Sequence, residues 1–438
     1  MVSARSLALH ALVALDRGHI DRLRDGLDSQ RLAPRDQAFA FDLAHGVLRR
    51  ERLLDHVMSG LAHRGLPKDS ELQMALRLGA YQLLFVRGMP AHAAVHETVE
   101  LVRGNRGFAN ALLRSLSRAI ASRAADPTQP TRELALAPEL TLLLPSPLPE
   151  DPVARLAIVH SLPDFFVARC REQFGDVGAA QVAEAASAVP GVFLRVVAGR
   201  ERAALQQELA ASEVRTELAN SPRLLRWTGG NSPFATAAFR AGHFLVQDPT
   251  ALAAAEAVPC GPGDLVVDLC AAPGTKTTLL AERVRPGGRV FAFDVDPVRR
   301  RSIVDNVTRL RLQDVVEVVT DATRLPRADA VLVDVPCSNT GVLGRRVEVR
   351  DRLEAGTFAE LAAVQRELLQ QAIALCKPGG AIVYSTCSID STENDAVVAA
   401  VLADPASPRC EVITSQLTLP LAGEHDGGFF AVLRRAKP

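Results

Sequence analysis

The chain has 438 residues, of which 48% are hydrophobic and 23% are charged, and its formal net charge is zero. At roughly 100–200 residues per domain, this length predicts two or three domains, and the apolar share excludes a disordered chain. No apolar run reaches the about 18 residues that a transmembrane helix needs, and the N-terminus has no signal-type apolar run. We therefore expect a cytoplasmic protein.

The cysteines are scattered along the chain and do not form a metal-binding motif. No C-x-x-C occurs, and no histidine lies at ligand spacing from a cysteine, which argues against a disulfide framework and against a zinc site. We expect no metal and a reducing compartment. The seven cysteines are Cys170, Cys260, Cys270, Cys337, Cys376, Cys387 and Cys410.

Residues 1–124 have the apolar spacing of amphipathic helices, in runs such as Leu7–Leu15, Phe39–Leu48 and Glu71–Val86. Turn residues separate the runs, so we predict an all-α domain. The first 120 residues hold 17 Lys and Arg against 12 Asp and Glu. This excess fits a nucleic-acid partner, although charge alone favours ordinary solvated helix faces.

The next two segments are less regular. Residues 125–152 are rich in Pro, Ala and Leu without a period, which predicts a linker. Residues 153–240 mix helical runs with short strands such as Val192–Val197, which predicts a small α+β module.

Residues 241–438 alternate between strand and helix. The predicted strands are Leu265–Cys270, Arg289–Phe293, Val315–Val319, Ala330–Asp334 and Ala381–Ser385, with helices such as Thr275–Val284, Pro297–Leu310 and Leu361–Cys376 between them. This alternation predicts a Rossmann-like α/β domain with a doubly wound parallel sheet, in which ligands bind beyond the carboxyl ends of the strands.

Polar residues follow each of the five predicted strands. The first strand leads into a turn of small residues before a helix, and such a turn lets a ligand approach the backbone closely. An acid alone at such a position is often a helix N-cap, and a lone cysteine is usually a small core residue. When such residues follow five parallel strands of one sheet, however, they would meet in one crevice at the carboxyl ends of the strands. The first strand is followed by the turn residues Cys270, Ala271, Ala272, Pro273, Gly274, Thr275 and Lys276. The later strands are followed by Asp294, Asp321, Asp334 with Cys337, and Cys387.

Two thiols and a carboxylate in one crevice fit the methylation of a pyrimidine at C5. C5 of cytosine is a poor nucleophile, but a thiolate that adds to C6 turns the ring into an enamine whose C5 attacks an electrophilic methyl group. A second thiol near C5 could help to release the product. The spacing does not decide which of Cys337 and Cys387 is the nucleophile.

Three motifs resemble motifs I, IV and VI of the RNA 5-methylcytosine methyltransferases. They are Asp268–Thr277 (DLCAAPGTKT), Asp334–Gly341 (DVPCSNTG) and Tyr384–Ser388 (YSTCS), and Glu393-Asn394 and Asp426–Phe430 also fit. The N-terminal runs Ala33–Asp36, Gly46–Arg49, Leu76–Leu83 and Gly107–Arg114 resemble a NusB-like domain. This combination is similar to the bacterial Sun/RsmB family, which methylates a cytosine of 16S ribosomal RNA.

The resemblance implies a role for each residue of the crevice. The loop from Cys270 to Lys276 would hold S-adenosylmethionine, together with Asp294 at the ribose and Asp321 at the adenine. Asp334 would contact both the target base and the cofactor side. Cys387 would be the nucleophile, and Cys337 would assist product release.

Two positions depart from the family pattern. Thr275 replaces a loop glycine, so we expect the turn to adapt. The stretch Val342–Arg350 lacks the family's His-Pro and Trp, but its arginines could contact RNA phosphates.

We therefore predict an S-adenosylmethionine-dependent 16S rRNA cytosine-C5 methyltransferase that acts as a monomer on naked or partly assembled small-subunit RNA, away from any membrane. The target base must be flipped out of its stack to reach a thiolate. The alternatives are the same chemistry on tRNA or another RNA, and a non-catalytic NusB-like RNA-binding or assembly factor.

Overall fold

The structure is a computed structural model that describes residues 3–27 and 32–437. These residues form two compact units. Unit 1 comprises Met1–Ala188 together with the separate segment Leu343–Leu353, and unit 2 comprises Val189–Val342 and Glu354–Pro438. The chain therefore leaves unit 2 after Val342, contributes eleven residues to unit 1, and returns.

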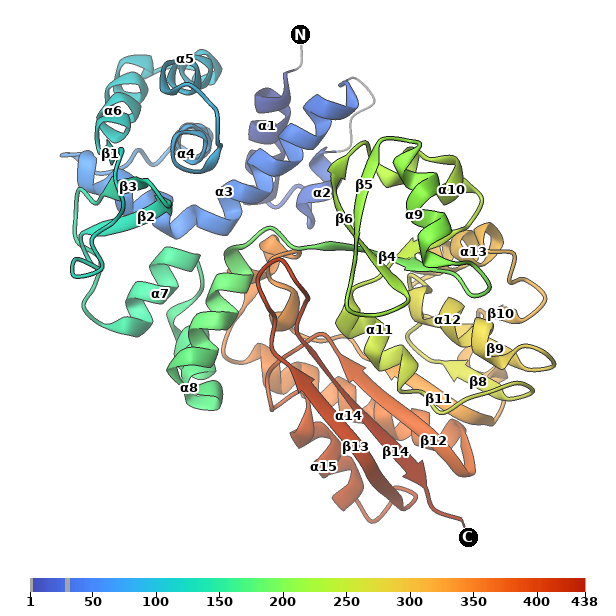
Figure 1. The fold of residues 1–438 in the computed structure, drawn as a ribbon. Helices are drawn as coiled ribbons and strands as arrows, with labels where there is room; N and C mark the ends of the chain where they lie inside the picture. The colour runs from blue at the N-terminus through green and yellow to red at the C-terminus, as the bar shows by residue number, and fades with distance from the viewer. Residues whose placement is uncertain (1–2, 28–31, 438) are drawn as a thin grey trace. The chain divides into compact units, whose positions relative to one another are not determined.

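Unit 1 begins with a bundle of helices, drawn in blue to cyan in Figure 1. Its core consists of Leu, Ala and Val side chains, as the helical spacing of the sequence predicts. Glycine at position 46 is required by packing, because a Cβ there would lie 1.9 Å from the Tyr81 ring. The helices are α1 (Ala4–Asp16), α2 (Leu23–Leu27), α3 (Pro34–Leu61), α4 (Ser70–Phe85), α5 (Ala91–Leu101) and α6 (Arg106–Arg118).

Residues 125–152, which we predicted to be a linker, contain regular structure. Strands β1 (Ile120–Ala121), β3 (Leu140–Leu143) and β2 (Glu133–Ala137) form a small antiparallel sheet in that order. The alternating Leu and Ala of β2 is a short strand pattern, which the neighbouring prolines obscured. Leu142 is fully buried in the core of the helical bundle, so this sheet is packed onto unit 1.

The predicted module 153–240 is divided between the two units. Helices α7 (Pro152–His160) and α8 (Asp164–Ser187) belong to unit 1, and α8 is interrupted at Gly175, whose φ is +71°. The rest belongs to unit 2, where four antiparallel strands follow the order β5-β6-β4-β7. The elements are β4 (Val192–Val196), α9 (Arg202–Ala210), β5 (Val214–Leu218), β6 (Leu224–Gly230), η1 (Pro233–Ala235), α10 (Ala237–Arg240) and β7 (Phe244–Val246).

The main sheet of unit 2 has seven strands in the order β10-β9-β8-β11-β12-β14-β13, drawn from yellow to red in Figure 1. The first five strands are parallel, as the sequence predicts, and the last two pair antiparallel. The strands are β8 (Leu265–Asp268), β9 (Arg289–Phe293), β10 (Val316–Val319), β11 (Ala328–Asp334), β12 (Cys376–Thr386), β13 (Cys410–Thr418) and β14 (Gly428–Arg435).

Helices cover both faces of this sheet. Because side chains alternate between the faces of a strand, Val331 and Val333 pack with α14 and α15, whereas Ala330 and Leu332 pack with α12 and α13. The remaining elements are α11 (Pro249–Glu256), α12 (Thr275–Val284), α13 (Pro297–Arg309), η2 (Ala322–Arg324), η3 (Thr340–Val342), η4 (Val347–Arg352), α14 (Thr357–Leu375) and α15 (Asp395–Ala403).

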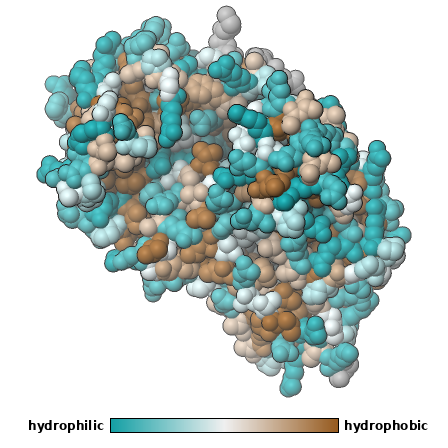
Figure 2. Space-filling view, viewed as in Figure 1, coloured by the Kyte–Doolittle hydropathy of each residue, from teal (hydrophilic) through white to brown (hydrophobic). Residues whose placement is uncertain are grey.

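Hydrophilic side chains are spread over the face drawn in Figure 2, with smaller hydrophobic groups between them. Across residues 3–27 and 32–437, none of the helices combines the length and the apolar character that a bilayer crossing requires.

Candidate active site

The carboxyl ends of the five parallel strands carry the predicted site residues in spatial order. Because the strands pair as β10-β9-β8-β11-β12, the edge of the sheet presents Asp321, Asp294, the loop after β8, Asp334 and Cys387 in turn. The structure thus confirms that these positions share one edge, which is where a doubly wound sheet binds ligands.

Gly274 supplies the sharp turn between β8 and α12. It has a φ of +95°, and an added Cβ would lie 3.2 Å from the Cα of Ile303. Thr275 is already the first residue of α12, where an ordinary helical φ suits a β-branched side chain. The turn thus accommodates Thr275 with a helical backbone, because the left-handed position belongs to Gly274.

Lys276 and Asp334 form an ion pair between α12 and the end of β11. The Lys276 Nζ lies 2.6 Å from Asp334 Oδ2, and the Ser385 hydroxyl donates to Asp334 Oδ1 at 2.6 Å. Burial lowers the pKa of Lys276, but the charge and hydrogen bond of Asp334 outweigh it, so the net pKa is raised. The lysine therefore stays charged and holds the Asp334 carboxylate in one orientation.

The two cysteines of the predicted site are adjacent. The Sγ atoms of Cys337 and Cys387 lie 3.2 Å apart, and both thiols are free. Cys337 is buried, and its hydrogen bond with Cys387, together with burial, raises the pKa of the Cys337 thiol well above its usual value. Cys387 is only half-buried, so it is the more accessible of the two.

A buried polar network fixes the two cysteine loops to each other. Glu393, with no exposed surface, accepts hydrogen bonds from the backbone N–H of Ser338 at 2.9 Å and from the Ser338 hydroxyl. Asn394 accepts from the Thr386 hydroxyl at 2.7 Å. Satisfied buried networks rigidify the groups they connect. This explains the place of Glu393-Asn394 in the motif pattern.

A small cavity of about 70 Å³ opens beside Cys387. The predicted residues Lys276, Asp334 and Cys387 line it, whereas Cys337 does not. Asp248 and Asp426 also line it, and the Asp426 N–H donates to Asp248 Oδ2 at 3.1 Å. The cavity is thus bounded by the start of α11, the end of β12 and the turn before β14.

Asp294 and Asp321, which we predicted to bind the cofactor, both accept hydrogen bonds from the neighbouring backbone. Asp294 is buried, accepts from the backbone N–H groups of Ala272 at 3.2 Å and Asp296 at 3.1 Å, and so holds the loop after β8. Asp321 accepts from the N–H of Thr323 at 2.9 Å and caps η2. Both acids therefore support the local backbone, in addition to any ligand contact.

Two further residues lie among the predicted site residues and were not singled out from the sequence. Asp268 is buried at the end of β8, where Oδ2 accepts from Thr277 at 2.7 Å and Oδ1 has no hydrogen-bond partner. Asn339 lies between the cysteines, with a left-handed φ of +59°. Both residues stand within the quoted motifs, which is the signal that could have identified them.

The stretch Val342–Arg350, which departs from the family pattern, contains arginines that are not all accessible to RNA. Arg350 is 2% exposed and lies within unit 1, where it donates to the backbone carbonyls of Ala186 at 2.8 Å and Arg49 at 3.2 Å. Its other acceptors are the carbonyls of Leu48, His160, Ser161 and Leu343. The expectation that Arg350 contacts phosphates was wrong, because a guanidinium this buried serves to hold the backbone together.

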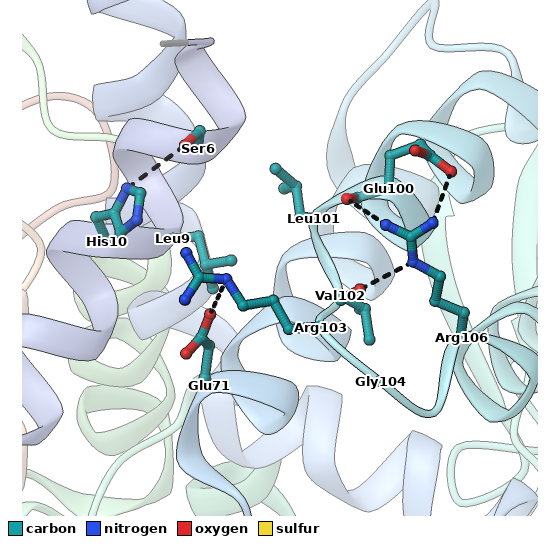
Figure 3. Close-up of a pocket in the computed structure, with 10 residues that line it drawn as sticks. All are labelled: Ser6, Leu9, His10, Glu71, Glu100, Leu101, Val102, Arg103, Gly104 and Arg106. Carbon is teal, nitrogen blue, oxygen red and sulfur yellow. Dashed lines mark hydrogen bonds and ion pairs between the residues drawn. The ribbon is translucent and has the colours of Figure 1, made fainter. Parts of the chain in front are cut away.

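A larger pocket of about 450 Å³ lies in the helical bundle of unit 1 and is drawn in Figure 3. Its two arginines face carboxylates: Arg103 lies 3.7 Å from Glu71, and Arg106 lies 3.5 Å from Glu100. The charges balance, so the pocket offers no excess charge to a ligand. Within the described part of the chain, no cluster of His, Cys, Asp and Glu is arranged to hold a metal ion.

Comparisons with known proteins place this geometry in a family. Residues 257–427 match the family described as 16S rRNA methyltransferase RsmB/F, and residues 2–118 match the NusB family. The chain is 32% identical to the ribosomal RNA small subunit methyltransferase B of Thermus thermophilus, over 98% of this chain and 97% of that protein. It is 30% identical to the protein of the same name from Vibrio cholerae, over 99% and 98%.

Solved structures share the fold. The crystal structure of PH0851 has a TM-score of 0.75 at 22% identity and covers 99% of each chain. NSun6 from Pyrococcus horikoshii with SFG has a TM-score of 0.55 at 20% identity, over 63% of this chain and 99% of that one. The full-length relatives, the two family matches and the shared arrangement of the sheet agree, and the chain belongs to the RsmB family of methyltransferases, with a NusB domain followed by a Rossmann-like methyltransferase domain.

Proposed function

We propose that this methyltransferase transfers a methyl group from S-adenosylmethionine to C5 of a cytosine in 16S ribosomal RNA, through a covalent bond between Cys387 and C6. The observation that carries the proposal is the pair of thiols, 3.2 Å apart, beside the Lys276–Asp334 ion pair. The names of the full-length relatives support ribosomal RNA as the substrate.

The residues after β8 and β9 fit S-adenosylmethionine. The unpartnered Oδ1 of Asp268 is a buried acceptor that a donor group of the ligand would satisfy. The turn at Gly274 leaves no room for a side chain, and α12 begins there with free N–H groups. Cys270–Lys276, Asp294 and Asp321 would hold the ligand. When bound, S-adenosylmethionine supplies an electrophilic methyl group on a sulfonium.

The accessible thiol, Cys387, is the better nucleophile. It lines the cavity, while Cys337 is buried behind it with a pKa held well above the usual value. As the Cys387 thiolate adds to C6, the S–C6 bond forms and the electrons of the C5–C6 double bond make C5 nucleophilic. Asp334, oriented by Lys276 and Ser385, would contact the N3 and N4 edge of the base.

Release reverses the addition. After C5 has gained its methyl group, a base removes the C5 proton, the C5–C6 double bond forms again, and the electrons of the S–C6 bond return to Cys387. Cys337 is the thiol next to this bond, so it is the residue that would assist release. The NusB domain would grip the RNA, mainly through phosphates and shape.

The test is transfer of a labelled methyl group from S-adenosylmethionine to unmodified 16S rRNA transcript and to small-subunit particles, followed by mapping of the product. We expect one labelled 5-methylcytosine. Transfer to tRNA instead of 16S rRNA would keep the chemistry and contradict the substrate. Failure to label any RNA and to bind S-adenosylmethionine would favour a non-catalytic assembly factor.

A further inference from the structure

Asn339 joins the loops of both cysteines. Its Nδ2 donates to the backbone carbonyl of Cys337 at 2.8 Å, and its Oδ1 accepts from the Cys387 Sγ at 3.4 Å. The neighbouring Gly341 N–H donates to the Cys387 carbonyl at 2.9 Å, so the two loops are fixed to each other at this point. Asn339 is itself only half-buried.

The direction of these hydrogen bonds follows from the chemistry of the partners. The Cys337 carbonyl oxygen has no proton and can only accept, so the asparagine must present its NH₂ group to it. The Oδ1 oxygen is therefore the atom that faces Cys387. Because this oxygen can only accept, the resting Cys387 thiol donates the hydrogen bond to Asn339 Oδ1. This hydrogen bond fixes one rotamer of the cysteine.

The backbone conformation of Asn339 also indicates that its side chain has a role beyond the turn. A φ of +59° is unfavourable for most side chains and is adopted most readily by Gly, and after it by Asn and Asp. Glycine would satisfy the turn alone with less strain. The amide at this position therefore does something that the turn does not require.

We infer that Asn339 is a positioning residue that holds the Cys387 sulfur, before its proton leaves, in the orientation from which the thiolate attacks the target base. This inference rests on the proposed function, because the attack it serves is the covalent step described there. Since a misplaced nucleophile slows a reaction without weakening substrate binding, the contribution belongs in kcat and not in KM.

The test compares Asn339→Gly with Asn339→Ala in the full-length protein. Glycine keeps the left-handed backbone and removes only the amide, whereas alanine removes the amide and strains the turn. We expect kcat for methyl transfer to fall about 10-fold in both variants, with the KM values for RNA and S-adenosylmethionine unchanged. The melting temperature should fall further in the alanine variant than in the glycine variant, because only alanine also strains the turn. A glycine variant with wild-type kcat would overturn the inference and leave Asn339 as a turn residue.

A second measurement does not depend on the RNA substrate. In crystals of the glycine variant, we expect the Cys387 side chain to occupy more than one rotamer, where the wild type has one. A single, unchanged rotamer would also overturn the inference. If the wild-type protein methylated no RNA, the proposed function would fail, while the rotamer of Cys387 would still decide whether Asn339 positions the thiol.

Discussion

Asp268 is a residue of the candidate site whose burial costs stability in the ligand-free protein. Its side chain is buried, and Oδ1 lacks a hydrogen-bond partner. Burial raises the pKa of this carboxyl to about 7, and the single bond from Thr277 offsets only part of the effect. A group this costly to ionise in the folded protein is expected where a ligand completes its environment.

This pKa predicts a pH dependence of stability for the ligand-free protein. Between pH 4 and pH 7, the unfolded chain has an ionised Asp268 while the folded protein keeps it protonated, so stability falls as the pH rises through this window. Above about pH 7 the folded protein holds the buried charge. Asp268→Asn removes this titration, and its melting temperature relative to wild type should rise by about 3 °C or more from pH 4 to pH 8.

The control for this experiment is Asp305→Asn, since Asp305 is exposed on α13. Its melting temperature relative to wild type should stay level over the same range. A difference between Asp268→Asn and wild type that is flat from pH 4 to pH 8 would contradict the assignment of the shifted group.

At the scale of elements, η4 is held in unit 1 by the buried guanidinium of Arg350 together with the buried side chain of Val347. Arg350 donates to carbonyls at the middle of α3, the end of α7 and the end of α8. At the ends of α7 and α8, where the last carbonyls have no helical donors, the guanidinium supplies donors, and its removal leaves those carbonyls buried and unpaired. Arg350 is therefore one of the residues that hold the segment Leu343–Leu353, beside Arg49, which donates to the Gly344 carbonyl at 2.9 Å.

We predict that Arg350→Ala destabilises the protein by about 3 kcal/mol or more in urea-induced unfolding. The matched variant is Arg352→Ala, two residues away. Arg352 is about half exposed and bonds to the Asp21 carbonyl at 2.8 Å, so we expect a change within about 0.5 kcal/mol. Equal effects of the two variants would be incompatible with the role given to Arg350.

At the scale of the whole molecule, the two units are linked by more than one crossing of the chain. Unit 1 needs Leu343–Leu353, which lies far along the sequence from its other residues. Val347 from this segment is fully buried in the core of the helical bundle. A fragment that begins at Val189 retains the segment but has lost every one of its partners in unit 1.

This organisation predicts a difference in proteolysis. Trypsin should cleave the fragment 189–438 rapidly after Arg346, Arg350 or Arg352, while the full chain should resist cleavage after Arg350, which is 2% exposed. Mass spectrometry of the first peptides released identifies the sites. Equal resistance of the fragment would mean that the segment folds without unit 1.

Local patterns in the sequence predicted the parallel strands of the main sheet and the residues at their carboxyl ends. The parallel strands are short apolar runs, and the polar residues after them were correctly predicted to share one sheet edge, because strand ends in a doubly wound sheet must meet there. β13 was not predicted, because seven of its nine residues are exposed and no alternation marks it.

Long-range contacts could not be predicted in the same way. An arginine in a loop has the same local pattern whether it faces phosphate or carbonyls, and the acceptors of Arg350 lie as far as 302 residues away in sequence. The role of Asn339 depends on a left-handed dihedral and on two partners, one of them 48 residues away. Long-range partners and dihedral angles of this kind are set by the tertiary fold and could not be predicted from local sequence patterns.

The most direct test of the central claim is the fate of RNA bound to the two cysteine variants. With 16S rRNA and S-adenosylmethionine, Cys337→Ala should accumulate a protein–RNA adduct that survives a denaturing gel, because attack proceeds and release is slow. Cys387→Ala should form no adduct and transfer no methyl group, with its affinity for S-adenosylmethionine nearly unchanged. An adduct with Cys387→Ala and none with Cys337→Ala would reverse the two roles, and methyl transfer by Cys387→Ala at the wild-type rate would contradict the covalent mechanism.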